Sequence, residues 1–199
     1  MRCCTPCVGD KLLSSRPRSR HSRPLPGGRI DGDTLSAANY SVIDKVGMPH
    51  VIEFVRQRMR AFDTRPLDWL KLLPLNRNVL LHGECTFPGE TAARGHSHGY
   101  RIRASVNVIM PPPYRFDHYG RVPSARHPRG WVSGEQTFFF DDLAECALHT
   151  LAHECFHYLS DTGQVELENS EANANWWADR WLDDYRSFVE PGGQMRLFC

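Results

Sequence analysis

The pattern of apolar and polar positions first becomes regular over residues 48–62. Val51, Val55 and Met59 recur there at intervals of four residues, so they fall on one face of a helix. Pro49 is compatible with the first helical turn, where its missing N–H leaves no hydrogen bond unmade. We therefore predict an amphipathic helix over this segment.

Over residues 100–110, apolar and polar side chains alternate one by one, and this period of two predicts a half-buried strand. Residues 78–87 form a second predicted strand, and the glycine-containing segment 88–99 between them reads as a loop. Three prolines at 111–113 end the later strand. The alternating apolar positions are Ile102, Ala104, Val106 and Val108, set against Arg101, Arg103, Ser105 and Asn107.

The segment 114–134 is rich in arginine, histidine, proline and glycine, and we interpret it as a long irregular loop. A loop of that length inside a compact domain is typically a lid, a binding element or a disordered segment. Its arginines alternate with aromatic residues, a composition that suits either nucleic-acid contact or a lid over a peptide groove. The residues concerned are Arg115, Arg121, Arg126 and Arg129, with Tyr114, Phe116 and Tyr119.

Two strong helical patterns close the chain. Asp141 or Asp142 can cap a helix that runs to about residue 159, and Asn169 or Ser170 can cap another that runs to about residue 189. Cys155, Trp176, Trp177 and Trp181 fit these helices as packing residues. The elements together predict an α+β domain with a small, mostly antiparallel sheet, an N-terminal helix and two C-terminal helices.

Charge divides the chain into two parts. Residues 1–30 carry seven basic side chains and one acid, a charge of +6, whereas residues 31–199 carry −5. The first segment also has few large apolar side chains, so we predict a disordered basic tail followed by one folded domain. Such a tail is either a solvated segment without a dedicated partner or an arm that attracts nucleic acid.

Composition narrows the class of protein further. Apolar residues make up 41% of the 199 residues and charged residues 24%, which is globular usage. No apolar run approaches the roughly 18 residues that a membrane span needs, so we predict no membrane association. The basic N-terminus is not followed by an apolar core typical of an export signal. We therefore expect the seven cysteines to be reduced thiols in a cytoplasmic protein.

The first C-terminal helix contains the sequence His-Glu-Cys-Phe-His over residues 153–157. Side chains four residues apart lie one turn apart on the same helix face, so His153 and His157 can bind one metal ion. Glu154 lies beside them on the helix and can polarise a water molecule without binding the ion itself. The pattern predicts a zinc site with a neighbouring general base.

A catalytic zinc ion normally takes three protein ligands. His157 is the last histidine in the chain, so a third ligand downstream must be a carboxylate or Cys199. Glu171 is best placed, in the first turn of the final helix, and Asn175 follows on the same face, where it can orient a ligand. The other downstream acids are Asp161, Glu166, Glu168, Asp179, Asp183, Asp184 and Glu190.

Residues 150–157 and 171–178 together resemble the gluzincin class of zinc metallopeptidases, which pair an HExxH helix with a second helix that supplies a glutamate. The second segment is similar to that of small intracellular peptidases of the ImmA/IrrE type. The resemblance implies a zincin-like domain with His153, His157 and Glu171 as zinc ligands and Glu154 as general base. Many relatives have aspartate where this chain has Asn175.

The resemblance also implies a protein or peptide substrate held by strand addition at a sheet edge. Residues 100–110 are our candidate for that region of the sheet. His149, Tyr158 and the segment 114–131 are candidates for stabilising the oxyanion.

Two other functions remain open from the sequence. The metal site can instead stabilise a non-catalytic binding or regulatory module. The chain also resembles, more distantly, SprT-like proteases that act near DNA, although those use a third histidine after the motif and this chain has none.

Overall fold

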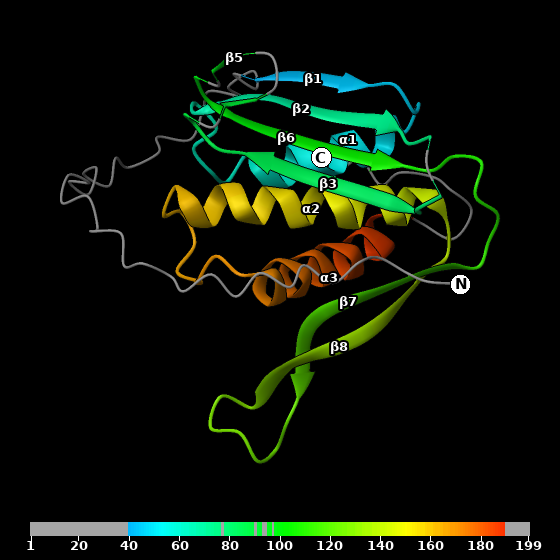
Figure 1. Cartoon of the computed structure of the whole chain (residues 1–199), viewed down its shortest axis with the longest axis vertical. Helices are drawn as coiled ribbons and strands as arrows, with labels where there is room; N and C mark the ends of the chain where they lie inside the picture. The colour runs from blue at the N-terminus through cyan, green and yellow to red at the C-terminus, as the bar shows by residue number, and fades with distance from the viewer. Residues whose placement is uncertain (1–39, 77, 90, 93–94, 97, 190–199) are drawn as a thin grey trace. The chain divides into compact units, whose positions relative to one another are not determined.

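The computed structural model describes residues 40–189 except 77, 90, 93–94 and 97. The predicted basic tail, its three cysteines and Cys199 lie outside these residues. Over the described part the chain is an α+β fold with three helices and a small mixed sheet (Figure 1). No helix within these ranges combines the length and apolar character of a membrane-spanning segment.

The central sheet contains four strands: β1 (Ser41–Asp44), β2 (Leu67–Pro74), β6 (Tyr100–Val106) and β3 (Leu81–Thr86), in that spatial order. β1 pairs with β2 and β2 with β6 in parallel, and only β3 pairs antiparallel, with β6. The prediction of a mostly antiparallel sheet is therefore wrong. A helix connects β1 to β2, and such a crossover returns the chain in the same direction.

One face of this sheet is apolar and the other is polar, as the alternation predicted. Ile102, Ala104 and Val106 of β6 are completely buried, whereas Arg101 and Arg103 on the opposite face are half-buried. β6 ends four residues earlier than predicted because a turn follows, in which the Met110 N–H donates to the Asn107 carbonyl. A separate pair of short strands, β4 (Thr91–Ala92) and β5 (Gly95–His96), lies in the segment predicted as a loop.

The segment 114–134 is not an irregular loop. It forms most of a long antiparallel hairpin in which β7 (Tyr114–Pro123) pairs with β8 (Trp131–Phe140) along its whole length. Seven residues, 124–130, connect the strands, and Gly130 adopts a positive φ of 73° there. The hairpin extends from the body of the domain below α3 (Figure 1).

The three predicted helices are confirmed as α1 (Pro49–Met59), α2 (Leu143–Asp161) and α3 (Glu171–Phe188). Asp142 caps α2 by accepting from the Glu145 N–H, and Ser170 caps α3 by accepting from the Asn173 N–H. α2 packs against β3 and β6, and α3 runs back beside α2 with the hairpin against it (Figure 1).

Aromatic side chains hold α3 in place. Trp181 is buried and meets Phe54 of α1 edge to face, and Trp177 packs on Phe156 of α2. Trp176 differs from these packing residues, because its ring faces the guanidinium of Arg121 on β7. Trp176 therefore joins α3 to the hairpin.

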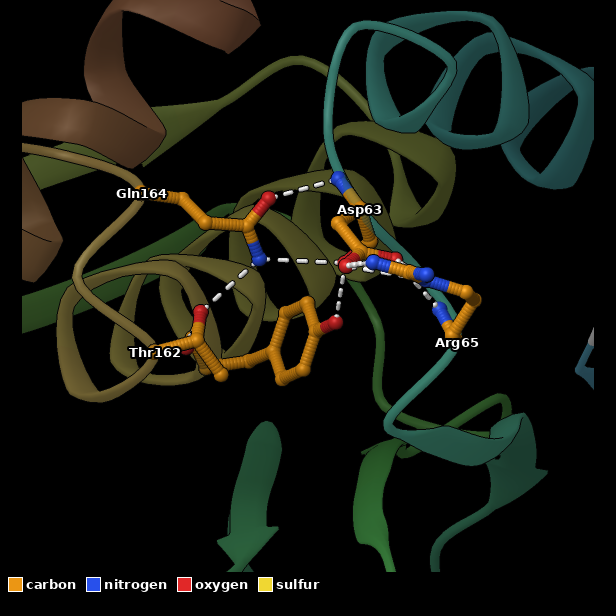
Figure 2. Close-up of polar contacts among 5 residues, drawn as sticks. Asp63, Arg65, Thr162 and Gln164 are labelled. Atoms are coloured by element: carbon orange, nitrogen blue, oxygen red, sulfur yellow. Dashed lines mark hydrogen bonds and ion pairs between the residues drawn. The ribbon is translucent and has the colours of Figure 1, made fainter. Parts of the chain in front are cut away.

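A polar cluster fixes the C-terminal end of α2 (Figure 2). The Gln164 carboxamide accepts from the Asp63 N–H at 2.6 Å and donates to the Asp63 carbonyl at 3.0 Å and to the Thr162 hydroxyl at 2.8 Å. The Tyr158 hydroxyl also donates to the Asp63 carbonyl. These bonds anchor the start of the loop that leads to α3, and so help to set where α3 begins.

Candidate metal centre

The helix spacing brings two imidazoles together on α2. The Nε2 atoms of His153 and His157 lie 3.1 Å apart, one helical turn along the same face. Glu171, the first residue of α3, places one carboxylate oxygen 3.2 Å from Nε2 of His153 and the other 3.5 Å from Nε2 of His157. The three predicted ligand residues therefore meet at one point.

These distances fit a zinc ion. Zinc binds nitrogen and oxygen at about 2.0–2.1 Å, and a tetrahedral ion with such bonds separates its ligand atoms by about 3.3 Å. The two Nε2 atoms lie 3.1 Å apart, and they lie 3.2 and 3.5 Å from the two different oxygens of the Glu171 carboxylate. With one ligand atom taken from each residue, the three atoms lie within 4.8 Å of one another. Two imidazoles and one carboxylate are also a donor set that suits zinc and leave a fourth position for solvent. His153, His157 and Glu171 could therefore hold a zinc ion.

Two asparagines fix the imidazoles in the tautomer that metal binding needs. Nδ1 of His153 lies 2.8 Å from the Asn175 carboxamide oxygen, and Nδ1 of His157 lies 2.6 Å from that of Asn169. An amide oxygen can only accept, so each Nδ1 carries a proton, and each Nε2 is the nitrogen left to bind a metal ion or, without metal, a second proton. The Asn175 amide in turn donates to the Tyr119 carbonyl at 2.9 Å, which settles its orientation.

The Asn175 contact was predicted from its place on the helix, whereas the Asn169 contact was missed. Asn169 looked like an alternative cap for α3, but Ser170 fills that role. Both asparagines orient the histidines without adding negative charge beside them, unlike the carboxylates that often serve this purpose.

Glu154 lies beside the cluster without joining it. Its carboxylate is 3.9 Å from Nε2 of His153, and the residue is only 7% exposed. Burial raises its pKa to about 7, against the lowering effects of the His153 charge and of a hydrogen bond from the Cys85 N–H. A buried carboxyl group with a pKa near neutrality is suited to accept and return a proton.

A glycine on the neighbouring strand makes room for this carboxyl group. A Cβ atom at Gly83 of β3 would lie 2.2 Å from the nearer Glu154 oxygen, far inside contact distance. Only glycine at this position allows the Glu154 side chain to take its present course between α2 and β3.

β3, rather than β6, is the strand that could receive an extended peptide. β6 pairs on both sides, with β2 and β3, so it is not an edge strand; the sequence left open which strand of this region forms the edge. β3 is the last strand of the sheet order, and it packs against α2. Within residues 40–189, as far as they are described, no strand pairs with its other edge. This free edge belongs to a strand that packs against the helix carrying the candidate metal ligands.

A cavity of about 290 Å³ opens beside the cluster. Residues from β3, β7, α2 and α3 surround it, including Gly83, Glu154, Glu171 and Asn175. The hairpin supplies its outer wall, so the segment predicted as a lid does border the site, although it does so as a regular pair of strands.

Two of the candidates for stabilising an oxyanion are engaged elsewhere. The Tyr158 hydroxyl donates to the Asp63 carbonyl, away from the cavity. Nε2 of His149 lies 3.0 Å from the Asp179 carboxylate. Burial lowers the pKa of His149 to about 3 and raises that of Asp179 to about 7, so His149 is neutral at physiological pH.

His118 lies in the segment 114–131, which was a candidate only as a whole, and it lines the same cavity from β7. It is 8% exposed, and neither ring nitrogen has a hydrogen-bond partner among the described residues. Burial lowers its pKa to about 4. The signal that could have found it is the alternation of Phe116, His118 and Gly120 with polar residues, hidden in an arginine-rich segment.

Two arginines of the hairpin make contacts within the domain. The Arg121 guanidinium lies between the rings of Trp131 and Trp176, 4.4 and 4.5 Å from their centroids, and donates to the Asn173 side chain. Arg115 pairs with Asp117. The predicted core position of Cys155 is confirmed, because it is fully buried and burial raises its thiol pKa.

No protein-family model, curated protein or solved structure matches this chain. Its candidate function therefore rests on the chemistry of the residues gathered at this site.

Proposed function

We propose that this protein is a zinc-dependent metallopeptidase with a zincin-like domain that hydrolyses protein or peptide substrates. One observation carries the proposal: a ligand atom from each of His153, His157 and Glu171 lies within 4.8 Å of the other two. Glu154 adds a buried carboxyl group 3.9 Å from one of these ligands. Three ligands, an open position and an adjacent base are what hydrolysis at a zinc ion requires.

His153, His157 and Glu171 would hold the ion. When bound, zinc lowers the pKa of water and polarises a peptide carbonyl group. Glu154 then accepts a proton from water as it attacks the carbonyl carbon, and returns that proton to the amine that leaves. Asn175 and Asn169, which contact Nδ1 of each imidazole, would leave both Nε2 atoms directed at the ion.

An extended peptide would lie along the free edge of β3. Main-chain hydrogen bonds to an edge strand bind a peptide with little regard for its sequence, and pockets for alternate side chains supply the selectivity. The cavity between β3 and the hairpin is one such pocket, since Gly83 and Glu154 both border it. The scissile bond would then lie between this edge and the metal ligands.

The test is cleavage of a diverse peptide library by protein stripped of metal and reloaded with zinc, with products identified by mass spectrometry. A broad library is needed because a narrow substrate preference would escape a test on one protein. We expect cleavage by the wild type, loss of at least a hundredfold in Glu154→Gln, and wild-type activity in Glu84→Gln, an exposed acid on β3.

Two outcomes would contradict the proposal. Equal cleavage by wild type and Glu154→Gln would indicate a contaminating protease. Zinc binding that raises thermal stability without cleavage of any library member would instead support the non-catalytic, metal-stabilised module.

A further inference from the structure

We propose that the groove between the hairpin and the start of α3 binds a carboxylate group of the substrate through Arg121 and Arg129. This inference rests on the proposed peptidase function and names a chemical class of substrate for that site.

The groove continues from the candidate metal centre. It has a volume of about 770 Å³, within the range of ligand pockets, and lies between the two hairpin strands with their connecting loop, the loop before α3 and the first turn of α3. Glu171 and Tyr119 border both this groove and the smaller cavity beside Glu154. A peptide whose cleaved bond lies at the candidate metal ligands can therefore extend into the groove.

Arg121 is held firmly in the wall of this groove. Its guanidinium group lies between the indole rings of Trp131 and Trp176, 4.4 and 4.5 Å from their centroids. Its Nε atom donates to the Asn173 carboxamide oxygen at 2.9 Å, and its Nη2 atom donates to the same oxygen. A guanidinium group fixed in this way loses little conformational freedom when it binds a ligand.

The remaining donors of Arg121 are available to a ligand. An arginine side chain has five N–H groups, and Nη1 has no hydrogen-bond partner among the described residues. Protein atoms do not enclose Nη1 either, so a ligand in the groove can reach it.

No carboxylate neutralises the charge of Arg121. Burial lowers the pKa of its guanidinium group, and the positive charge of Arg129, which also borders the groove, lowers this pKa further. Within residues 40–189, where the structure describes them, neither arginine side chain forms an ion pair; Arg129 uses only its backbone N–H, which donates to Nδ1 of His127 at 3.3 Å. Two neighbouring arginines without a counter-ion favour an anionic ligand.

Acidic residues border the opposite wall. Glu166 and Glu168, from the loop before α3, are exposed, so water and salt screen their charges. In the described part of the chain neither of them pairs with Arg121 or Arg129. The third acid is Glu171, whose charge a bound zinc ion would offset. These acids restrict the proposed contact to the wall that the hairpin forms.

A carboxylate is the anion that a peptide offers to this wall. Its two oxygens match two N–H groups of a guanidinium group. The carboxylate can belong to an aspartate or glutamate side chain, or to the C-terminus of the substrate. Because the groove begins at Glu171, the residue that carries the carboxylate lies close in sequence to the cleaved bond.

The experiment uses two sets of peptide pairs. The first compares glutamate with glutamine and aspartate with asparagine at each of the three positions on either side of the cleaved bond, in peptides with an amidated C-terminus. The second compares free with amidated C-termini at the same distances, in peptides without acidic residues. We expect the wild type to favour the charged member by tenfold or more in kcat/KM in one set, and that set identifies the source of the carboxylate.

Substitutions of the arginines assign the preference to this groove. Arg129→Gln removes a charge without removing a described side-chain contact, so it should keep zinc content and melting temperature and reduce the preference at least threefold. Arg121→Gln should abolish the preference, and Arg121→Lys, which keeps the charge without the planar group, should retain only part of it. The matched control is Arg126→Gln, at an exposed arginine of the same loop outside the groove, which should keep the wild-type preference.

Failure of this inference can be told from failure of the proposed function. An active wild type without any preference for the charged members would overturn the carboxylate site alone, as would a preference that persists in both Arg121→Gln and Arg129→Gln. If Arg121→Gln does not fold, Arg129→Gln decides. If no peptide is cleaved, the peptidase proposal fails, and dissociation constants of the same pairs for zinc-loaded Glu154→Gln still decide the carboxylate site. Equal affinities for both members of every pair would overturn it.

Discussion

Replacing Gly83 by alanine tests whether the Glu154 carboxyl group acts as the base. The new methyl group would lie 2.2 Å from the nearer carboxylate oxygen and 2.8 Å from the carboxyl carbon. Ordinary contact begins at 3.4 Å, so the oxygen must move by about 1.2 Å. The atoms that move are the end of a flexible side chain, so the carboxyl group shifts while the backbone of β3 stays in place.

The expected effect is large on activity and small on stability. A displacement of about 1 Å of a reacting group can reduce a rate by about a hundredfold, equivalent to about 2.7 kcal/mol in the barrier. The three atoms nearest to the new methyl group all belong to Glu154 and not to a candidate zinc ligand. We therefore predict that Gly83→Ala loses about a hundredfold in kcat/KM and retains both its zinc and its melting temperature.

The assay measures kcat/KM on a peptide that the wild type cleaves, together with zinc per chain and thermal unfolding. His82→Ala, on the outward face of the same strand, is the matched control. In a Glu154→Gln background, Gly83→Ala should not lower kcat/KM any further, because the side chain that it displaces can no longer act as a base. Full activity of Gly83→Ala would refute the assignment of Glu154 as the base.

Three other predictions concern zinc. Asn175→Ala removes the acceptor for the His153 Nδ1 proton and should weaken zinc binding by about 10–100-fold in a chelator competition; unchanged affinity would argue against the orienting role. The pKa of His153 lies above its ordinary 6.5, because the hydrogen bond to Glu171 and nearby negative charge together outweigh burial. Zinc must displace that proton, so affinity in the same assay should rise with pH through this raised pKa, and a flat profile from pH 6 to 8 would contradict it. Free zinc at a thousand times its dissociation constant should stabilise the wild-type fold by about 4 kcal/mol, which raises the melting temperature by about 10 °C. The same zinc concentration should raise the melting temperature of His157→Ala only slightly.

The parts of the site that depend on local spacing could be predicted from the sequence. His153 and His157 share a helix face because they are four residues apart, and that relation holds wherever the helix packs. Glu171 followed from the absence of any later histidine and from its place in the first turn of the next helix. The structure brings its carboxylate to 3.2 Å from His153, as this reasoning requires.

The order of the sheet could not be predicted, because β1 and β2 give weak signals. β1 has only four residues. In β2 the pairing register shifts between Leu67 and Trp69, so the apolar positions lose the period of two that identifies a strand. Without these two strands, only the antiparallel pair of β3 and β6 was visible in the sequence.

The hairpin was missed for a different reason. Its inward positions include His118 and Gly120, which carry no apolar signal, and its outward positions include charged pairs such as Arg115 with Asp117. The hairpin is regular because β7 pairs with β8 along its length. A hydropathy pattern does not reveal such pairing. The burial of His118 could not be predicted from the sequence either, because it results from tertiary packing.

The most direct test of the metal centre is the zinc content of purified, untagged protein, measured by mass spectrometry of the metal. We predict one zinc per chain in the wild type and in Glu166→Ala, an exposed acid in the loop before α3. His153→Ala and Glu171→Ala should each contain almost none. Zinc retained at one per chain in Glu171→Ala would contradict the three-ligand site on which the proposed hydrolysis depends.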